Sequence, residues 1–188
     1  MIFREFYNYI LQTDYKVNEE LPFPVNSASF GKGGVLTKYN EIEKKVYFIQ
    51  SGIVELKIKG YQTEKIIDFF FENEMFCALT SFLTQTPSDV QITAITNCEL
   101  DMVLYDDLIL AYESSLEANK FARIITEQGY IRKAKREKEF LVETAEERYA
   151  KMFATHKNYI SEIPVNKIAK YLGIHPESLS RIRKKLTS

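Results

Sequence analysis

The sequence predicts an α+β protein in which an antiparallel β-roll or barrel is followed by a long helix and a C-terminal helix-turn-helix domain. Short segments rich in β-branched and aromatic residues recur between residues 35 and 104, with glycine-containing turns between them, which is typical of a small antiparallel barrel. From Asp106 onward the apolar residues follow helical spacing instead. Residues 165–186 then carry the spacing of two short helices that meet at a corner.

We expect three parts in the 188 residues: a β-roll domain with an N-terminal helix over 1–110, a long dimerisation helix over 111–142, and a helix-turn-helix domain over 143–188. Residues 1–110 hold 9 basic and 16 acidic side chains (net −7), whereas residues 111–188 hold 16 and 10 (net +6). A basic end suits a polyanion, and an acidic end avoids one. This asymmetry favours contact between the C-terminal part and a polyanion.

Cysteine content and hydropathy indicate the cellular compartment of the protein. Cys77 and Cys98 are too few for a disulfide scaffold, so reduced thiols inside a cell are the default expectation. No apolar run approaches the roughly 20 residues of a membrane span, and no signal peptide is visible. We therefore expect a soluble, cytoplasmic protein without a membrane partner. No cofactor is expected, because two cysteines cannot ligate a four-cysteine cluster and the two histidines lie outside the barrel.

The elements of the first part follow in order. An apolar stripe over residues 2–12 predicts a helix. Within the segment 53–59, Val54, Leu56 and Ile58 are expected to point into the barrel. The charged residues between them, Glu55 among them, are expected to point outward from the barrel. Strands are expected at residues 35–36, 46–49, 53–59, 66–71, 90–96 and 98–104.

Helical spacing dominates the second part. A long amphipathic segment is expected from Asp106 to about Leu141, with a break near residues 113–115 or a partner chain, because the barrel alone cannot cover such a length. Its apolar stripe is typical of a dimer seam, and the alternative is that it packs only on its own barrel. The charge run 132–138 is interpreted as a solvated face, with phosphate contact as the lesser alternative. His156 is interpreted as a cation at a helix C-terminus.

A capping box at residues 144–147 predicts the start of another helix, and the two corner-forming helices follow it. Gly173 occupies the turn that needs a positive φ, and Pro176 occupies a first-turn position. Residues 176–187 are expected to enter a DNA major groove, and residues 165–188 carry a net charge of +5. The alternative is a helical hairpin with a solvated basic face. The expected DNA-binding residues are His175, Glu177, Ser178, Arg181, Lys184, Lys185 and Lys170.

The chain resembles the Crp/Fnr family of bacterial transcription regulators in the order of its parts and in three motifs, Val46–Gly52, Ile168–Gly173 and Glu177–Ile182. The resemblance implies a cyclic-nucleotide-binding-like β-roll, a homodimer, an inverted repeat of double-stranded DNA as the target, and RNA polymerase as a further candidate partner. In the family, a glutamate and an arginine one helical turn apart read base edges, and they match Glu177 and Arg181.

This sequence also departs from the family pattern. The family's additional base-contacting arginine is replaced by Pro176, so the preferred half-site should differ, and the family's winged hairpin is hard to see in residues 157–164. Where the family's cyclic-nucleotide members have Gly-Glu-Leu, this chain has Cys77-Ala78-Leu79, and Ser88-Asp89 replaces their phosphate-binding arginine.

The effector site is therefore expected to be degenerate. Residues 66–119 contain ten acidic side chains and no Lys, Arg or His, and a buried phosphate needs a charged partner. We therefore do not expect a response to cyclic AMP. Either a neutral or weakly polar ligand occupies the site, or its residues only fill a vestigial position. The candidate effector-pocket residues are Cys77, Thr80, Ser81 and Ser88.

The function predicted is sequence-specific regulation of transcription, not catalysis. A first alternative keeps the DNA contact but lets the barrel bind another small ligand or a protein partner, so that the effector is unknown. A remote alternative is a cupin-like barrel enzyme. Metal chemistry of that kind needs several histidine ligands inside the barrel, and residues 1–155 contain no histidine.

Overall fold

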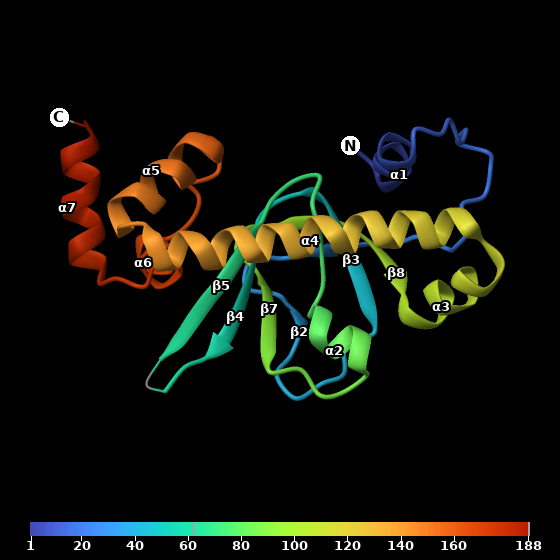
Figure 1. Cartoon of the computed structure of the whole chain (residues 1–188), viewed down its shortest axis with the longest axis horizontal. Coiled ribbons are helices and arrows are strands. Elements are labelled where there is room, and N and C mark those ends of the chain that lie inside the picture. Colours follow the sequence, from blue (N-terminus) through green and yellow to red (C-terminus); the bar gives the residue numbers. More distant parts are fainter. Residues whose placement is uncertain (62, 188) are drawn as a thin grey trace.

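A computed structural model describes residues 1–61 and 63–187 of the chain (Figure 1). The long helix α4 (Leu116–Val142) crosses the molecule along its length. The strands lie on one side of this helix, and the C-terminal helices gather at one of its ends. The chain is therefore α+β, as predicted. No helix in the described part of the chain is long and apolar enough to cross a membrane.

Two four-stranded antiparallel sheets form the roll, and their facing sides bury apolar residues of β3, β4, β7 and β8. The six strands expected from the sequence are all present, and β1 and β6 are additions. The first sheet has the order β1 (Asn26–Phe30), β8 (Cys98–Leu104), β3 (Lys45–Ser51) and β6 (Met75–Phe76). The second has the order β2 (Val35–Thr37), β7 (Val90–Ala94), β4 (Val54–Lys59) and β5 (Glu64–Phe70).

Helix α1 (Phe3–Leu11) begins where the sequence stripe predicts and packs on α4. Phe3, Phe6 and Tyr7 surround Phe121 of α4, with ring centroids 4.7–6.2 Å apart. The backbone N–H of Phe3 also donates to Asp101 Oδ2 at 3.1 Å, which anchors the helix to β8. Aromatic packing of this kind buries much apolar area and holds the long helix over the roll.

The expected break in the helical segment is confirmed. Helix α3 (Tyr105–Ser114) ends at Ser115, whose side chain accepts from the Ala118 N–H at 3.2 Å and so caps α4. The expectation of one apolar stripe along α4 is wrong. Phe121 is buried, but Ile131 and Leu141 are exposed on other sides, so the apolar residues do not share a face.

The C-terminal part consists of α5 (Ala145–Thr155), α6 (Val165–Leu172) and α7 (Pro176–Thr187). The capping box is confirmed, because the Thr144 N–H donates to Glu147 Oε2 at 2.8 Å and the Glu147 N–H donates to Thr144 Oγ1 at 3.3 Å. Gly173 ends α6 with a φ of +72°, as its place in the turn predicts. The link between α5 and α6 contains no strand among the described residues, so it holds no winged hairpin.

Helix α6 packs against the outer face of β4 and β5, and α5 and α7 pack on α6. Apolar residues of α5, α6 and α7 share one buried cluster with Ile53, Ile66 and Phe69 of the roll. Glu55 is nevertheless only 1% exposed. Its side chain points out of the roll as predicted, but α6 covers that face and Lys167 Nζ lies 2.6 Å from Glu55 Oε1.

His156 belongs to the same contact. Its ring stacks on Phe71, with centroids 4.1 Å apart. Burial, together with the nearby positive charge of Arg132, lowers the pKa of His156 below its ordinary 6.5. The interpretation of His156 as a cation at a helix end is therefore wrong. Although it caps α5, desolvation against the roll outweighs the field of the helix.

Candidate functional site

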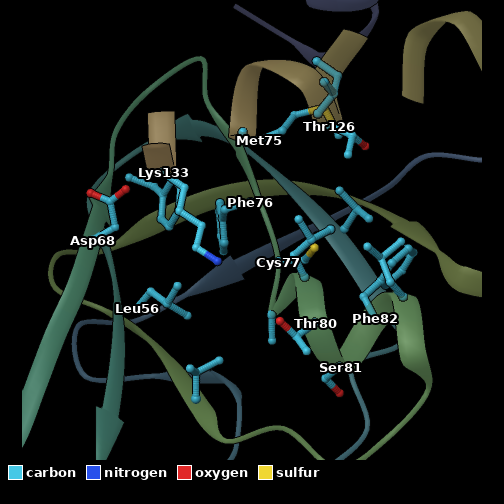
Figure 2. Close-up of a pocket in the computed structure, with 18 of the residues that line it drawn as sticks. Leu56, Asp68, Met75, Phe76, Cys77, Thr80, Ser81, Phe82, Thr126 and Lys133 are labelled. Carbon is cyan, nitrogen blue, oxygen red and sulfur yellow. The ribbon is translucent and has the colours of Figure 1, made fainter. Parts of the chain in front are cut away.

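A cavity of about 400 Å³ lies between the roll, α2 (Leu79–Thr84) and α4. Its volume falls within the roughly 300–1,000 Å³ of small-molecule sites. Most of its walls are apolar: β4 and β5 supply Leu56, Ile58 and Ile67, and α4 supplies Phe121 and Ile125. The remaining wall is built by Met75, Phe76, Cys77, Thr80 and Phe82, among others (Figure 2).

Lys133 brings a positive charge into this cavity from α4. Figure 2 shows its side chain descending from the helix, with the amine toward the side of the cavity that holds Phe76 and Leu56. The side chain is exposed, so solvent reaches it. Within the described chain it has no ion pair and no hydrogen bond of its side chain. It is thus a cation available to an incoming group.

Arg132 is tied to the roll instead. Its Nε donates to Asp68 Oδ2 at 2.7 Å, its Nη1 donates to Glu74 Oε1 at 2.8 Å, and its Nη2 donates to the Phe69 carbonyl at 2.6 Å. The two carboxylates raise the pKa of the guanidinium further. Figure 2 shows Asp68 directed toward α4 rather than toward the cavity centre. Its charge is therefore paired with Arg132 at the edge of the cavity.

The predicted effector residues separate into two groups. Cys77 and Thr80 line the cavity. Burial raises the pKa of the Cys77 thiol, so the side chain acts there as a small neutral group. Ser81 also lines it, but its hydroxyl donates to the Thr86 carbonyl at 2.5 Å and accepts from the Glu43 N–H at 2.9 Å.

The placement of Ser88 corrects the sequence expectation. Its hydroxyl is buried and donates to the Val90 carbonyl at 2.9 Å, and Ser88 is absent from the described lining of the cavity. Its neighbour Asp89 lines the cavity in its place. The local reason is that strand β7 begins at Val90, and the Ser88 hydroxyl forms hydrogen bonds with the backbone of Val90 at the start of the strand.

Glu43 makes the α2 end of the cavity unfavourable for an anion. The carboxylate is 3% exposed and lies beneath α2, where it accepts from the Thr37 hydroxyl at 2.5 Å and from the Ala78 N–H at 3.4 Å. Burial is the main cause that raises its pKa, while these hydrogen bonds oppose the rise. The N–H group that precedes α2 is therefore already shared with a carboxylate of the chain.

A second candidate site is the outer face of α7. Leu179 is buried, and Ile182 packs against the same cluster, so this side of the helix faces α5 and α6. The residues expected to contact DNA occupy the opposite side and its flanks. His175, Glu177, Ser178, Arg181, Lys184 and Lys185 are all exposed, as is Lys170 on α6. Glu177 and Arg181 are four residues apart and so share one helix face.

Within this set, Lys185 forms an intramolecular ion pair. Lys185 Nζ lies 2.7 Å from Glu146 Oε1 of α5, in a pair whose lysine side chain is 70% exposed. Pairs so exposed contribute at most about 1 kcal/mol, so the contact would yield to a phosphate. Figure 1 shows α7 at the outermost end of the molecule, beyond the end of α4, where the roll does not cover it.

Sequence reasoning missed the contribution of α4 to the cavity. It treated residues 132–138 as a solvated face and judged the site by residues 66–119, which hold no cation. The spacing of Phe121, Ile125 and Gly129 carries the buried side of α4 forward to positions 132 and 133. Extending that helical period would have indicated Lys133.

Comparisons with known proteins agree with this geometry. Residues 28–114 match the family model of the cyclic nucleotide-binding domain. A search of curated proteins found no significant match. FixK2 from Bradyrhizobium japonicum is similar in structure, with a TM-score of 0.75 and 18% identity over 87% of this chain and 85% of that one.

Two further solved structures show the same fold. The c-di-GMP-responsive global regulator CLP of Xanthomonas campestris has a TM-score of 0.64 and 17% identity, over 87% of this chain and 86% of that one. A putative Crp/Fnr-family regulator from Eubacterium rectale has a TM-score of 0.70 and 14% identity, over 87% and 78%. Residues 28–114, somewhat less than half of the chain, thus match the cyclic nucleotide-binding domain model, and the chain as a whole shares the fold of these solved structures.

Proposed function

We propose that this protein is a homodimeric, sequence-specific DNA-binding transcription regulator that does not respond to cyclic AMP. In this proposal α6 and α7 form a helix-turn-helix, and α7 is the recognition helix. The observation that carries it is the orientation of α7. Its apolar side is buried against α5 and α6, while Glu177 and Arg181 face outward on an exposed surface.

The chemistry of the outward residues supports base reading. Arg181 can pair bidentately with guanine O6 and N7, and Glu177 can accept from cytosine N4. Ser178 and His175 would contribute hydrogen bonds, and the lysines of the two helices would contact phosphates. A dimer would place two such helices roughly 34 Å apart, which corresponds to an inverted repeat.

Two features of the cavity argue against cyclic AMP. The buried Glu43 carboxylate lies beneath α2, and Asp89 lines the cavity beside it. Asp89 would repel a phosphate in the cavity, and Glu43 already accepts from the N–H group before α2 that a phosphate would need. Lys133 does supply a cation, but from the α4 side. The cavity thus suits a ligand whose charge lies near the long helix, and it favours a small-molecule effector over a vestigial site.

The proposal is tested by selecting bound sequences from random duplex DNA with the full chain. We expect enrichment of an inverted repeat whose half-sites lie about one helical turn apart, centre to centre. Arg123→Ala is a suitable control variant, because Arg123 is an exposed arginine of α4 that pairs with Glu127 on its own helix. It should enrich the same sequences as the parent, and absence of any enriched motif with the parent would reject the proposal.

A further inference from the structure

We propose that the cavity between the roll and α4 binds a small apolar monocarboxylate, with the Lys133 ammonium as its counter-ion. The inference rests on the proposed function in one respect, because it names the ligand class of the effector site. Its physical basis is the pairing of apolar walls with a cation that has no partner within the described chain.

The apolar walls of the cavity require that most of the ligand's surface is apolar. Leu56, Ile58, Phe76 and Phe121 line the cavity, and the Cys77 thiol among them stays neutral because burial raises its pKa. Burying an apolar ligand surface against such walls contributes roughly 25 cal/mol per Å². A sugar or a peptide would leave its hydroxyl or amide groups without partners there, and each such group is costly to bury.

The charges determine the head of the ligand. Three cations of α4 border the cavity, but Arg132 is held by Asp68 and Glu74, and Arg136 donates to the Tyr171 carbonyl at 3.0 Å. Figure 2 shows the amine of Lys133 directed into the cavity. One available positive charge fits one negative charge.

The opposite end of the cavity orients the ligand. Glu43 lies buried beneath α2, and Asp89 lines that side. A carboxylate placed there would meet the Asp89 carboxylate and no cation, so the head lies near α4 and the tail near the roll. A nucleotide phosphate bound at α2 would have the reverse orientation. This reversal is the reason that a monocarboxylate fits where a cyclic nucleotide does not.

Octanoate and 1-octanol form the test, because they share a tail and differ in the charge of the head. Isothermal titration calorimetry of the full chain should give a Kd for octanoate at least about tenfold below that for 1-octanol, a difference of about 1.4 kcal/mol. Lys133→Met should reduce this ratio to about one, and Lys133→Arg should keep most of it. Lys135→Met is the matched control, since Lys135 is exposed on α4 outside the cavity lining.

Three results would overturn the inference: equal affinities for octanoate and 1-octanol, an unchanged preference in Lys133→Met, or displacement of octanoate by cyclic AMP at a lower concentration. The titration contains no DNA. Loss of octanoate binding would therefore reject the ligand class while the DNA selection still stands. Conversely, a failed selection would reject the regulator proposal and leave the binding data unaffected.

Discussion

Three neighbouring cations on α4 have different tasks because each meets different surroundings. Arg132 is held by two carboxylates of the roll, Lys133 reaches into the cavity, and the guanidinium of Arg136 lies 3.6 Å from the centroid of the Tyr171 ring. The planar, permanently charged guanidinium suits the multidentate and stacked contacts. A flexible ammonium suits a site that must accept an incoming group. At the scale of single residues, the charge run is therefore not a uniform solvated face.

His156 provides a residue-scale test through pH. Because burial lowers its pKa in the folded state, its contribution to stability is fully present above the unfolded value of 6.5 and is lost as the pH falls toward the lowered folded pKa. We expect His156→Gln, which cannot titrate, to lose less stability than the parent between about pH 7.5 and 5.5. Urea unfolding at both pH values measures the difference.

His175→Gln is the control for that experiment, since His175 is exposed in the turn between α6 and α7. It should follow the parent at both pH values. If His156→Gln also followed the parent, the stacking of His156 on Phe71 would not hold the imidazole neutral.

At the scale of elements, the docking of α6 on the roll depends on one ion pair inside an apolar contact. Lys167 Nζ lies 2.6 Å from Glu55 Oε1, and the other oxygen of the Glu55 carboxylate is buried without a hydrogen-bond partner in the described chain. Removing one member of such a pair is strongly destabilising because a charge is left buried, whereas neutralising both is not.

Lys167→Ala should therefore loosen α6. Hydrogen exchange of the α6 amides is expected to accelerate, in the range of roughly 5- to 150-fold for a loss of about 1–3 kcal/mol in docking free energy. Adding Glu55→Gln to this variant should restore most of the protection, because no buried charge then lacks a partner. Lys170→Ala, at an exposed position of the same helix, should leave exchange unchanged. Equal exchange in all variants would contradict the role of the pair.

The same scale shows what could be predicted from sequence. Strands, helix starts and the corner of α6 and α7 follow from local signals, such as the alternation over 53–59, the capping box at Thr144 and the positive φ of Gly173. Glu55 could not be placed in this way, because alternation indicates which side of a strand a residue occupies and not what covers that side. The place of Lys133 in the cavity could not be predicted for a similar reason, since the cavity wall combines elements far apart in the chain.

At the scale of the whole molecule, α4 connects the two candidate sites. Its side chains line the cavity, and Arg136, one helical turn after Arg132, donates to the Tyr171 carbonyl of α6. Ile131 is 64% exposed on this helix, and Leu141 is 79% exposed nearer its end. Exposed apolar residues on a long helix are typical of a surface that packs against a second copy of the chain.

Ile131→Asp tests that assembly. We expect the substitution to lower the fraction of dimer in sedimentation velocity, because a charge would be buried in the seam. Affinity for an inverted repeat should fall toward that for a half-site. Lys135→Asp is the control, because it also introduces a carboxylate at an exposed position of α4. A dimer fraction unchanged by Ile131→Asp would show that this part of α4 is not the interface.

The most direct test of the central claim is the affinity of the parent and of Arg181→Ala for the selected duplex and for a scrambled one, measured at one fixed salt concentration. We expect the parent to prefer the selected duplex by a factor of about 10³ or more. The variant should lose roughly 1–3 kcal/mol on the selected duplex, with relaxed preference at one base pair, and little on the scrambled one. If parent and variant bound both duplexes alike, α7 would not read DNA.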